Sequence, residues 1–322
     1  MSIIVTGGAG FIGSCIVRTL NDAGYTDIIV VDNICSTDKW RNLINKKYTE
    51  YISRNDFLVK LPEFSGKVSH VFHMGACSAT TERDFDFLYN NNFRFTKELW
   101  KFCTDEKIAF YYASSAATYG DGACGFDDKT DISVLRPLNG YGYSKQLFDL
   151  WVEKQITAPA QHCGFKFFNV YGPNEYYKGS MASVIFHSFN KISETGQMEL
   201  FKSYKEGYED GMQLRDFVYV KDLCKVMIFM MKHPDINGRF NLGTGKARSF
   251  YDLCANTFAA MGLTANIKFI DMPESLRPKY QYFTKADMSK LRSVGYDEPF
   301  YSLEDGIKDY VCNYLSKNYA TY

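Results

Sequence analysis

The 322-residue sequence predicts an α/β fold: a doubly wound parallel sheet, with a smaller C-terminal substrate-binding part interleaved with it. Three observations predict this fold. Glycines spaced Gly7-x-x-Gly10-x-x-Gly13 separate a β-branched run from a helical pattern. A second apolar run ends in an acid, Asp32. Strand-like and helix-like segments then alternate along the first half of the chain, which is typical of a Rossmann sheet.

The glycine spacing fits a loop that holds a diphosphate. Gly7 allows a tight turn, Gly10 lets the backbone approach the ligand, and Gly13 permits close packing of helix on strand. The N–H groups at the helix N-terminus are then free to bind the anion. Asp32 lies near the roughly 20-residue offset at which a carboxylate binds a ribose. The alternative is a glycine turn without a ligand, and the strand-loop-helix context favours the dinucleotide site.

Composition narrows the function classes. Lys+Arg and Asp+Glu both number 37, so the net charge does not indicate nucleic acid or an anionic membrane as a partner. We find no signal-peptide pattern and no apolar run near the ~20 residues of a membrane span. The nine cysteines form no CxxC pair, which argues against a zinc site or a disulfide framework. The expectation is a cytoplasmic protein without a metal.

Further strands are expected at 68–73, 108–113 and 164–170, with helices through 87–102 and 143–151. The small-residue loops after the first two of these strands, and Asn169 near the end of the third, should meet at one edge of the sheet. Beyond Pro173 we expect a helix at 182–192, a polar loop at 201–212, and strands at 215–220 and 240–245 around a helix starting near Asp222. Residues 1–172 and 214–246 are therefore assigned to the nucleotide-binding part, and 173–213 and 247–322 to the substrate-binding part.

Tyr141 and Lys145 form a candidate catalytic pair, one helical turn apart. A neighbouring cation lowers the pKa of a tyrosine, so we expect Lys145 to make the Tyr141 phenolate accessible as a base. Ser115, at the end of the preceding strand, is placed to hydrogen-bond the same substrate oxygen. Taken alone, Tyr-x-x-x-Lys also fits the start of a surface helix; behind a glycine fingerprint, the catalytic interpretation is favoured.

With these motifs the chain resembles the extended short-chain dehydrogenase/reductase superfamily. Its finer blocks resemble those of the ADP-glyceromanno-heptose 6-epimerases over residues 2 to about 312. The blocks are Gly75-Ala76-Cys77-Ser78-Ala79-Thr80-Thr81, Ser114-Ser115-Ala116-Ala117-Thr118-Tyr119-Gly120, Phe168-Asn169-Val170-Tyr171-Gly172-Pro173 and, most specific, Lys178-Gly179-Ser180-Met181-Ala182-Ser183-Val184-Ile185-Phe186-His187.

The resemblance implies an epimerase that acts on an ADP-heptose. The cofactor takes a hydride from C6 of the sugar, and the resulting ketone turns and receives the hydride on its other face. Two faces need two proton-transferring groups, which the resemblance assigns to Tyr141 and Lys178, with Lys145 holding the nicotinamide ribose. The alternative for Lys178 is a solvated loop lysine. The resemblance further implies a homo-oligomer, with pentamers among the relatives.

By the same resemblance, NADP is the expected cofactor, tightly bound, although an acid at Asp32 ordinarily favours NAD. Asn33, Lys39 and Arg54 are the residues available for a 2′-phosphate. The full set of cofactor positions comprises Gly7, Gly10, Phe11, Ile12, Gly13, Asp32, Asn33, Lys39, Arg54, Met74, Gly75, Ala76, Cys77, Ser78, Asn91, Lys145, Val170 and Lys178.

Substrate positions follow in the same way: Ser115, Asn169, Ser180, His187, Phe201, Arg215 and Tyr280. Arg215 has the bidentate geometry suited to a diphosphate, with an ion pair to Asp216 or another acid as the alternative. His187 could instead be a core histidine.

The chain departs from the family pattern at three places. Met74 stands in place of a glutamate, Arg54 in place of a lysine, and the segment 201–213 is longer. Among other functions, a 4,6-dehydratase is disfavoured because Ala116 and Ala117 stand where it needs an acid pair. A 4-epimerase acting on a hexose nucleotide and a non-catalytic nucleotide sensor remain alternatives.

Overall fold

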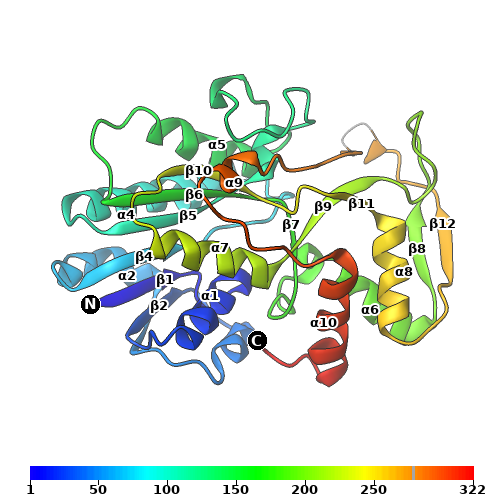
Figure 1. Ribbon diagram of the computed structural model, residues 1–322, viewed down its shortest axis with the longest axis horizontal. Helices are drawn as coiled ribbons and strands as arrows, with labels where there is room; N and C mark the ends of the chain where they lie inside the picture. The colour runs from blue at the N-terminus through cyan, green and yellow to red at the C-terminus, as the bar shows by residue number, and fades with distance from the viewer. Residues whose placement is uncertain (278–279) are drawn as a thin grey trace.

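The computed structural model describes residues 1–277 and 280–322, and its largest element is a seven-stranded parallel sheet (Figure 1). The strands lie in the order β10-β6-β5-β4-β1-β2-β3. The first six thus follow the 3-2-1-4-5-6 order of a doubly wound dinucleotide-binding sheet, with β10 added beside β6. The predicted fold class is confirmed. The strands are β1 (Ser2–Thr6), β2 (Ile28–Asp32), β3 (Glu50–Ser53), β4 (Val68–His73), β5 (Ala109–Ser115), β6 (Gln161–Phe167) and β10 (Gly238–Leu242).

Helices cover both faces of this sheet because successive strand residues point to opposite sides. Ile3 and Val5 of β1 belong to one apolar core together with α1 and α7, whereas Ile4 belongs to a second core with α2, α4 and α5. Both sets of strand side chains are almost fully buried. The helices are α1 (Phe11–Asp22), α7 (Val220–Lys232), α2 (Arg54–Lys60), α4 (Phe95–Asp105) and α5 (Gly140–Val152).

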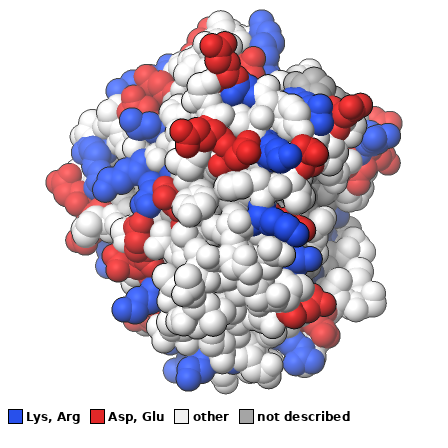
Figure 2. Space-filling view, turned by 90° about the vertical axis from the view of Figure 1, so that its right-hand side faces the viewer, with Lys and Arg blue, Asp and Glu red and all other residues white. Residues whose placement is uncertain are grey.

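The second part of the molecule lies beyond the carboxyl ends of these strands, on the right in Figure 1. It contains two small sheets, β11-β9-β7 and β12-β8. On the face shown in Figure 2, basic and acidic side chains lie beside one another in the upper area, and the lower area is largely uncharged. The elements are β7 (Asn169–Tyr171), β8 (Met198–Phe201), β9 (Leu214–Tyr219), β11 (Ala247–Ser249), β12 (Ile267–Ile270), α6 (Val184–Thr195), α8 (Phe250–Ala260), α9 (Ser289–Ser293) and α10 (Leu303–Asn313).

The two parts are interleaved. β9 pairs with β7 and β11, not with the large sheet. In the other direction, α9 returns to the large sheet, where the Lys290 ammonium lies 5.0 Å from the ring centroid of Phe240 in β10. The division at residues 172, 213 and 246 stays a prediction.

Local structure differs from expectation at several points. The strand expected over 164–170 breaks at Phe168, whose N–H bonds Leu242 of β10 (3.1 Å), and the chain then joins the small sheet as β7. The helix expected through 87–102 is one run of α3 (Phe85–Leu88), a π-helical segment η3 (Tyr89–Arg94) and α4. β5 continues through Ser114 and Ser115, two residues beyond the strand expected at 108–113. β3 and α2 had no counterpart in the sequence analysis.

Candidate active site

A cavity of about 460 Å³ opens where β1, β2, β4 and β5 end, and the glycine fingerprint forms its floor. Gly7 has φ +67°, and a Cβ there would lie 2.6 Å from the Gly75 nitrogen. A Cβ on Gly13 would lie 2.1 Å from the Gly7 oxygen. Both positions therefore require glycine, and the resulting close approach shapes a cradle that a dinucleotide fits.

Seventeen of the eighteen predicted cofactor positions line this cavity, and Val170 is the exception. They come from the fingerprint loop, the ends of β2 and β4, α2, η3, α5 and the loop before α6. Those that line it are Gly7, Gly10, Phe11, Ile12, Gly13, Asp32, Asn33, Lys39, Arg54, Met74, Gly75, Ala76, Cys77, Ser78, Asn91, Lys145 and Lys178.

The acid at the end of β2 is already paired. The Asp32 carboxylate accepts hydrogen bonds from the Ala9 amide (2.9 Å), the Asn33 amide (2.7 Å) and the Lys39 ammonium (2.7 Å). Lys39 also donates to the Asn33 carbonyl at 2.8 Å. The salt bridge offsets the negative charge that would otherwise repel a 2′-phosphate at this edge of the cavity.

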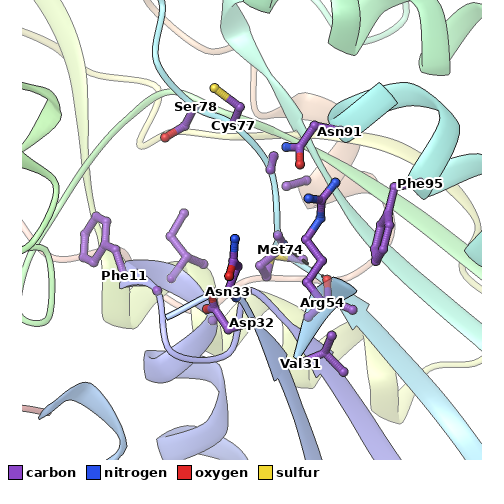
Figure 3. Close-up of a pocket in the computed structure, with 18 of the residues that line it drawn as sticks. Phe11, Val31, Asp32, Asn33, Arg54, Met74, Cys77, Ser78, Asn91 and Phe95 are labelled. Carbon is purple, nitrogen blue, oxygen red and sulfur yellow. Dashed lines mark hydrogen bonds between the residues drawn. The ribbon is translucent and has the colours of Figure 1, made fainter. Parts of the chain in front are cut away.

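Arg54 supplies a second positive charge beside Asp32. It is the first residue of α2, directly after β3, and its guanidinium lies 5.0 Å from the ring centroid of Phe95. Figure 3 shows Arg54 and Asn33 reaching into the cavity, with Phe95 flanking the guanidinium. Among the described residues Arg54 has no hydrogen-bond or ion-pair acceptor, and burial lowers its pKa. Its donors remain available to an anionic ligand.

The start of α5 holds Tyr141 and Lys145, the candidate catalytic pair. Asn139 caps the helix by accepting a hydrogen bond from the Gly142 amide at 2.8 Å. The Lys145 ammonium donates to the Ala113 carbonyl at 2.8 Å, and burial lowers the pKa of Lys145 to about 8. Tyr141 borders both this cavity and a second one.

The expected lowering of the Tyr141 pKa by Lys145 is wrong for the ligand-free chain. Burial raises the pKa of Tyr141, and only a hydrogen bond with Ser115 opposes that shift. Lys145 donates to the Ala113 carbonyl, and desolvation of the phenol decides the direction of the pKa shift of Tyr141.

Lys178 is not a fully solvated lysine. It is half-buried in the wall of the first cavity, and its ammonium lies 5.3 Å from the ring centroid of Phe11. Burial lowers the pKa of Lys178, and the nearby Glu175 carboxylate raises it. Both Lys178 and Tyr141 therefore face the same space.

The second cavity, of about 950 Å³, extends from Tyr141 into the substrate-binding part. Ser115, Asn169 and Ser180 line it as expected, and Val170 lines it instead of the first cavity. His187, Phe201, Arg215 and Tyr280 are absent from the described lining, and His187 is exposed on α6.

Arg215 packs behind this cavity. Its guanidinium lies between Phe250 (5.6 Å) and Tyr280 (5.5 Å), and it donates to the Leu214 and Gln281 carbonyls. The alternative ion pair with Asp216 does not occur. Instead, the Asp216 carboxylate accepts hydrogen bonds from Thr244, Gly245 and Ala286.

Sequence reasoning missed several residues of the site. Thr6, Val31, Phe95, Ser114 and Phe167 also line the first cavity. Four of these follow from the ends of strands that the sequence predicts, whereas Phe95 lies on the helix after η3 and carried no recognisable signal. Asn92, within η3, was also missed. It lies beside the cavity wall, and its side chain makes hydrogen bonds of 3.0 Å or shorter to Cys77 and Ser144.

Residues 3–243 match the model of the NAD dependent epimerase/dehydratase family. The chain belongs to this family. It is 52% identical to a protein of Fusobacterium nucleatum named ADP-L-glycero-D-manno-heptose-6-epimerase, over 98% of both chains. A protein of the same name from Nitratidesulfovibrio vulgaris is also 52% identical, over 97% of this chain and 98% of its own.

A solved structure shows the same likeness. The Helicobacter pylori ADP-L-glycero-D-manno-heptose-6-epimerase superposes with a TM-score of 0.81 at 27% identity, covering 97% of this chain and 95% of that one. The chain is therefore an epimerase of the family, and the resemblance inferred from its motifs is confirmed. Over residues 1–277 and 280–322, no helix has the length and apolar character to span a membrane.

Proposed function

We propose that this chain converts ADP-D-glycero-D-manno-heptose to ADP-L-glycero-D-manno-heptose by inverting C6. Two relatives that are 52% identical carry the name of that activity. The observation that carries the proposal is the place of Tyr141, which borders both the nucleotide cavity and the larger cavity beside it. A sugar held in the larger cavity would meet the phenol at the junction.

Bound NADP would accept a hydride from C6 and return it to the opposite face of the 6-ketone. Tyr141 and Lys178 would transfer the proton of the 6-hydroxyl, one group removing it as the ketone forms and the other donating it as the alcohol re-forms. Ser115 would hydrogen-bond the same oxygen. Lys145 donates once to Ala113 and keeps two further N–H groups for the nicotinamide ribose.

We propose NADP rather than NAD because two features favour a 2′-phosphate. Lys39 neutralises Asp32, and the Arg54 guanidinium has no acceptor among the described residues. A bidentate guanidinium–phosphate contact fits these groups. Val170 lines the larger cavity, so it would contact the cofactor only where the cofactor reaches that cavity.

For the substrate, Asn169 and Ser180 are supported as contacts because they line the larger cavity. Arg215 donates to the Leu214 and Gln281 carbonyls and keeps three further N–H groups that would bind the diphosphate. Phe201 and Tyr280, whose ring centroids lie 6.4 Å apart, would lie beside it, and His187 would approach from α6.

The test is to incubate the purified protein with ADP-D-glycero-D-manno-heptose without added cofactor and to separate the C6 epimers by chromatography. We expect a mixture of epimers, and at least an approximately 100-fold loss of rate in Tyr141→Phe and in Lys178→Met. Denaturing the protein and identifying the released nucleotide distinguishes NADP from NAD. No conversion after adding NADP and then NAD would refute the heptose assignment and direct the search to hexose nucleotides.

We also propose a cytoplasmic homo-oligomer. Aromatic side chains at Phe87, Tyr89 and Tyr143 are exposed on α3, η3 and α5, as subunit contacts would require. Sedimentation velocity measures the state, and a single monomeric species at micromolar concentration would contradict the proposal.

A further inference from the structure

The loop that carries Lys178 runs from the end of β7 to the start of α6 and is folded around a buried carboxylate. Glu175 is 1% exposed. Its carboxylate accepts hydrogen bonds from the Ser183 amide (2.5 Å), the Ser183 hydroxyl (2.6 Å) and the Gly172 amide (3.3 Å). Because Gly172 and Ser183 stand at opposite ends of the loop, one side chain holds both ends together.

The same residue fixes the backbone of Lys178. The Lys178 amide donates to the Glu175 carbonyl at 3.0 Å, and the Lys178 carbonyl accepts from the Met181 amide at 3.1 Å. The Lys178 ammonium, by contrast, makes no hydrogen bond or ion pair to any described residue. Its place in the cavity wall is therefore set by its backbone and by contact with Phe11.

The two charged groups also interact through space. Burial raises the pKa of Glu175, and the hydrogen bonds from Ser183 and the nearby Lys178 lower it. The carboxylate in turn raises the pKa of Lys178. The other titratable groups that face Glu175 are Tyr176 beside it and Tyr310 of α10, and burial raises the pKa of both phenols. Across the cavity, Lys178 faces Tyr141.

We infer that Glu175 is a positioning residue for Lys178: its carboxylate holds together the two ends of the loop that presents the ammonium to the cavity. The inference rests on the proposed role of Lys178 in proton transfer. It assigns a function to a buried acid that the proposed chemistry does not itself use.

The test compares Glu175→Gln, Glu175→Asp and a control, Asp222→Asn. Asp222 is also a buried carboxylate that accepts a backbone N–H, from Tyr301 at 2.8 Å, but it lies on α7 and lines neither cavity. One readout is the pH dependence of kcat/KM for epimerisation. The other is trace labelling of Lys178 with acetic anhydride over the same pH range, quantified by mass spectrometry, which needs no substrate.

In Glu175→Gln the attraction that favours the Lys178 ammonium is lost, so the pKa of Lys178 falls. We expect the acid limb of kcat/KM and the Lys178 labelling curve to move to lower pH by about one unit. We also expect kcat to fall at least about tenfold, because a carboxamide keeps only one acceptor oxygen and places an NH2 donor against a loop-end group that donates to the second carboxylate oxygen. Asp222→Asn should leave both curves at the wild-type pH, whatever its effect on the melting temperature.

Wild-type curves in Glu175→Gln would overturn the inference. If that variant does not fold, Glu175→Asp is the test, because aspartate keeps the charge but is too short to reach both loop ends. A reduced kcat with an unshifted acid limb of kcat/KM supports the inference. A wild-type kcat overturns it. A wild-type protein that does not epimerise the heptose would refute the proposed function, whereas the labelling curves would still test the coupling between Glu175 and Lys178.

Discussion

Under the proposed function, Arg54 would favour NADP over NAD. Its guanidinium stacks on Phe95 beside an acid that Lys39 already pairs. We predict that Arg54→Ala weakens NADP binding by about 10- to 100-fold, because a charge-assisted contact with the 2′-phosphate is worth about 1.5–3 kcal/mol. NAD, which lacks that phosphate, should bind with little change. Isothermal titration of cofactor-free protein measures both, and equal weakening of NAD and NADP would contradict the prediction.

Lys145 makes the stability of the ligand-free protein depend on pH. Burial lowers its pKa to about 8, whereas an unfolded lysine titrates near 10.4. Between these values the unfolded chain binds more protons, so the free energy of unfolding rises with pH, by at most about 3 kcal/mol. Lys145→Met lacks this gain. We predict that urea unfolding of wild type and Lys145→Met diverges in this direction from pH 8 to 10.4; parallel pH dependences would show the prediction to be wrong.

For single residues, the sequence predicts positions in the fold better than it predicts pKa values. Seventeen of the cofactor positions that the family resemblance implies lie around one cavity, because strand ends meet at one edge of a parallel sheet. The raised pKa of Tyr141 was not predictable in the same way. It depends on how deeply the phenol is desolvated, which is a property of the packed chain.

The π-helical segment η3 links the loop after β4 to helix α5 through Asn92. Its side chain bonds the Cys77 amide (2.9 Å) and carbonyl (3.0 Å) and the Ser144 hydroxyl (3.0 Å), and Ser144 in turn donates to the Tyr141 carbonyl. π-helical turns frequently occur at functional sites. Here the widened turn directs Asn92 inward, where it is 1% exposed.

We predict that Asn92→Ala destabilises the protein by about 2–3 kcal/mol, because it leaves the part-buried amide and carbonyl of Cys77 without a partner and removes one hydrogen bond of the buried Ser144 hydroxyl. Asn90→Ala, on the exposed side of the same segment, is the matched control and should cost about 0.5 kcal/mol or less. Chemical denaturation measures both. Similar losses in the two variants would contradict the role given to Asn92.

Element boundaries were predictable where period and turn signals agree, as for β4, which spans the expected residues 68–73. They were not where tertiary pairing decides. The break at Phe168 arises because its N–H bonds Leu242 of β10 and the next residues pair with β9, a partner 48 positions away. β3 was missed because two of its four residues, Glu50 and Tyr51, are exposed and give no continuous apolar run.

For the whole molecule, alternation along the chain predicts the doubly wound sheet, but it does not predict which distant segments meet. Gln281 donates to the Gly120 carbonyl at 2.7 Å and so ties the substrate-binding part to the loop after β5. Contacts across 161 positions leave no periodic trace in the sequence. The four predicted substrate residues outside the cavity lining illustrate this limit, since their distance from the cavity depends on how the two parts pack.

Further connections of this kind join residues 320–322 to the loop that carries Lys178. The Tyr322 amide donates to Asn174 at 2.9 Å, and the Tyr176 hydroxyl donates to the Ala320 carbonyl at 2.7 Å. Asn174 has φ +75° and also donates to Ser14 of α1, so the start of the Lys178 loop is fixed between the first helix and these last residues.

We predict that ending the chain after Asn318 lowers the free energy of unfolding by about 3 kcal/mol. The truncation removes the hydrogen bonds of Ala320 and Tyr322, and it exposes apolar surface that the Tyr322 ring covers. Because Asn174 is then held from one side only, kcat should fall more than the affinity for the cofactor. Tyr319→Phe is the control: it keeps the ring and removes a single hydrogen bond, to Asn190 (2.8 Å), so it should cost about 1 kcal/mol at most. Chemical denaturation measures the free energy of unfolding, and steady-state kinetics at the same protein concentration measures kcat. A truncated chain with wild-type kcat would show that these residues do not support the Lys178 loop.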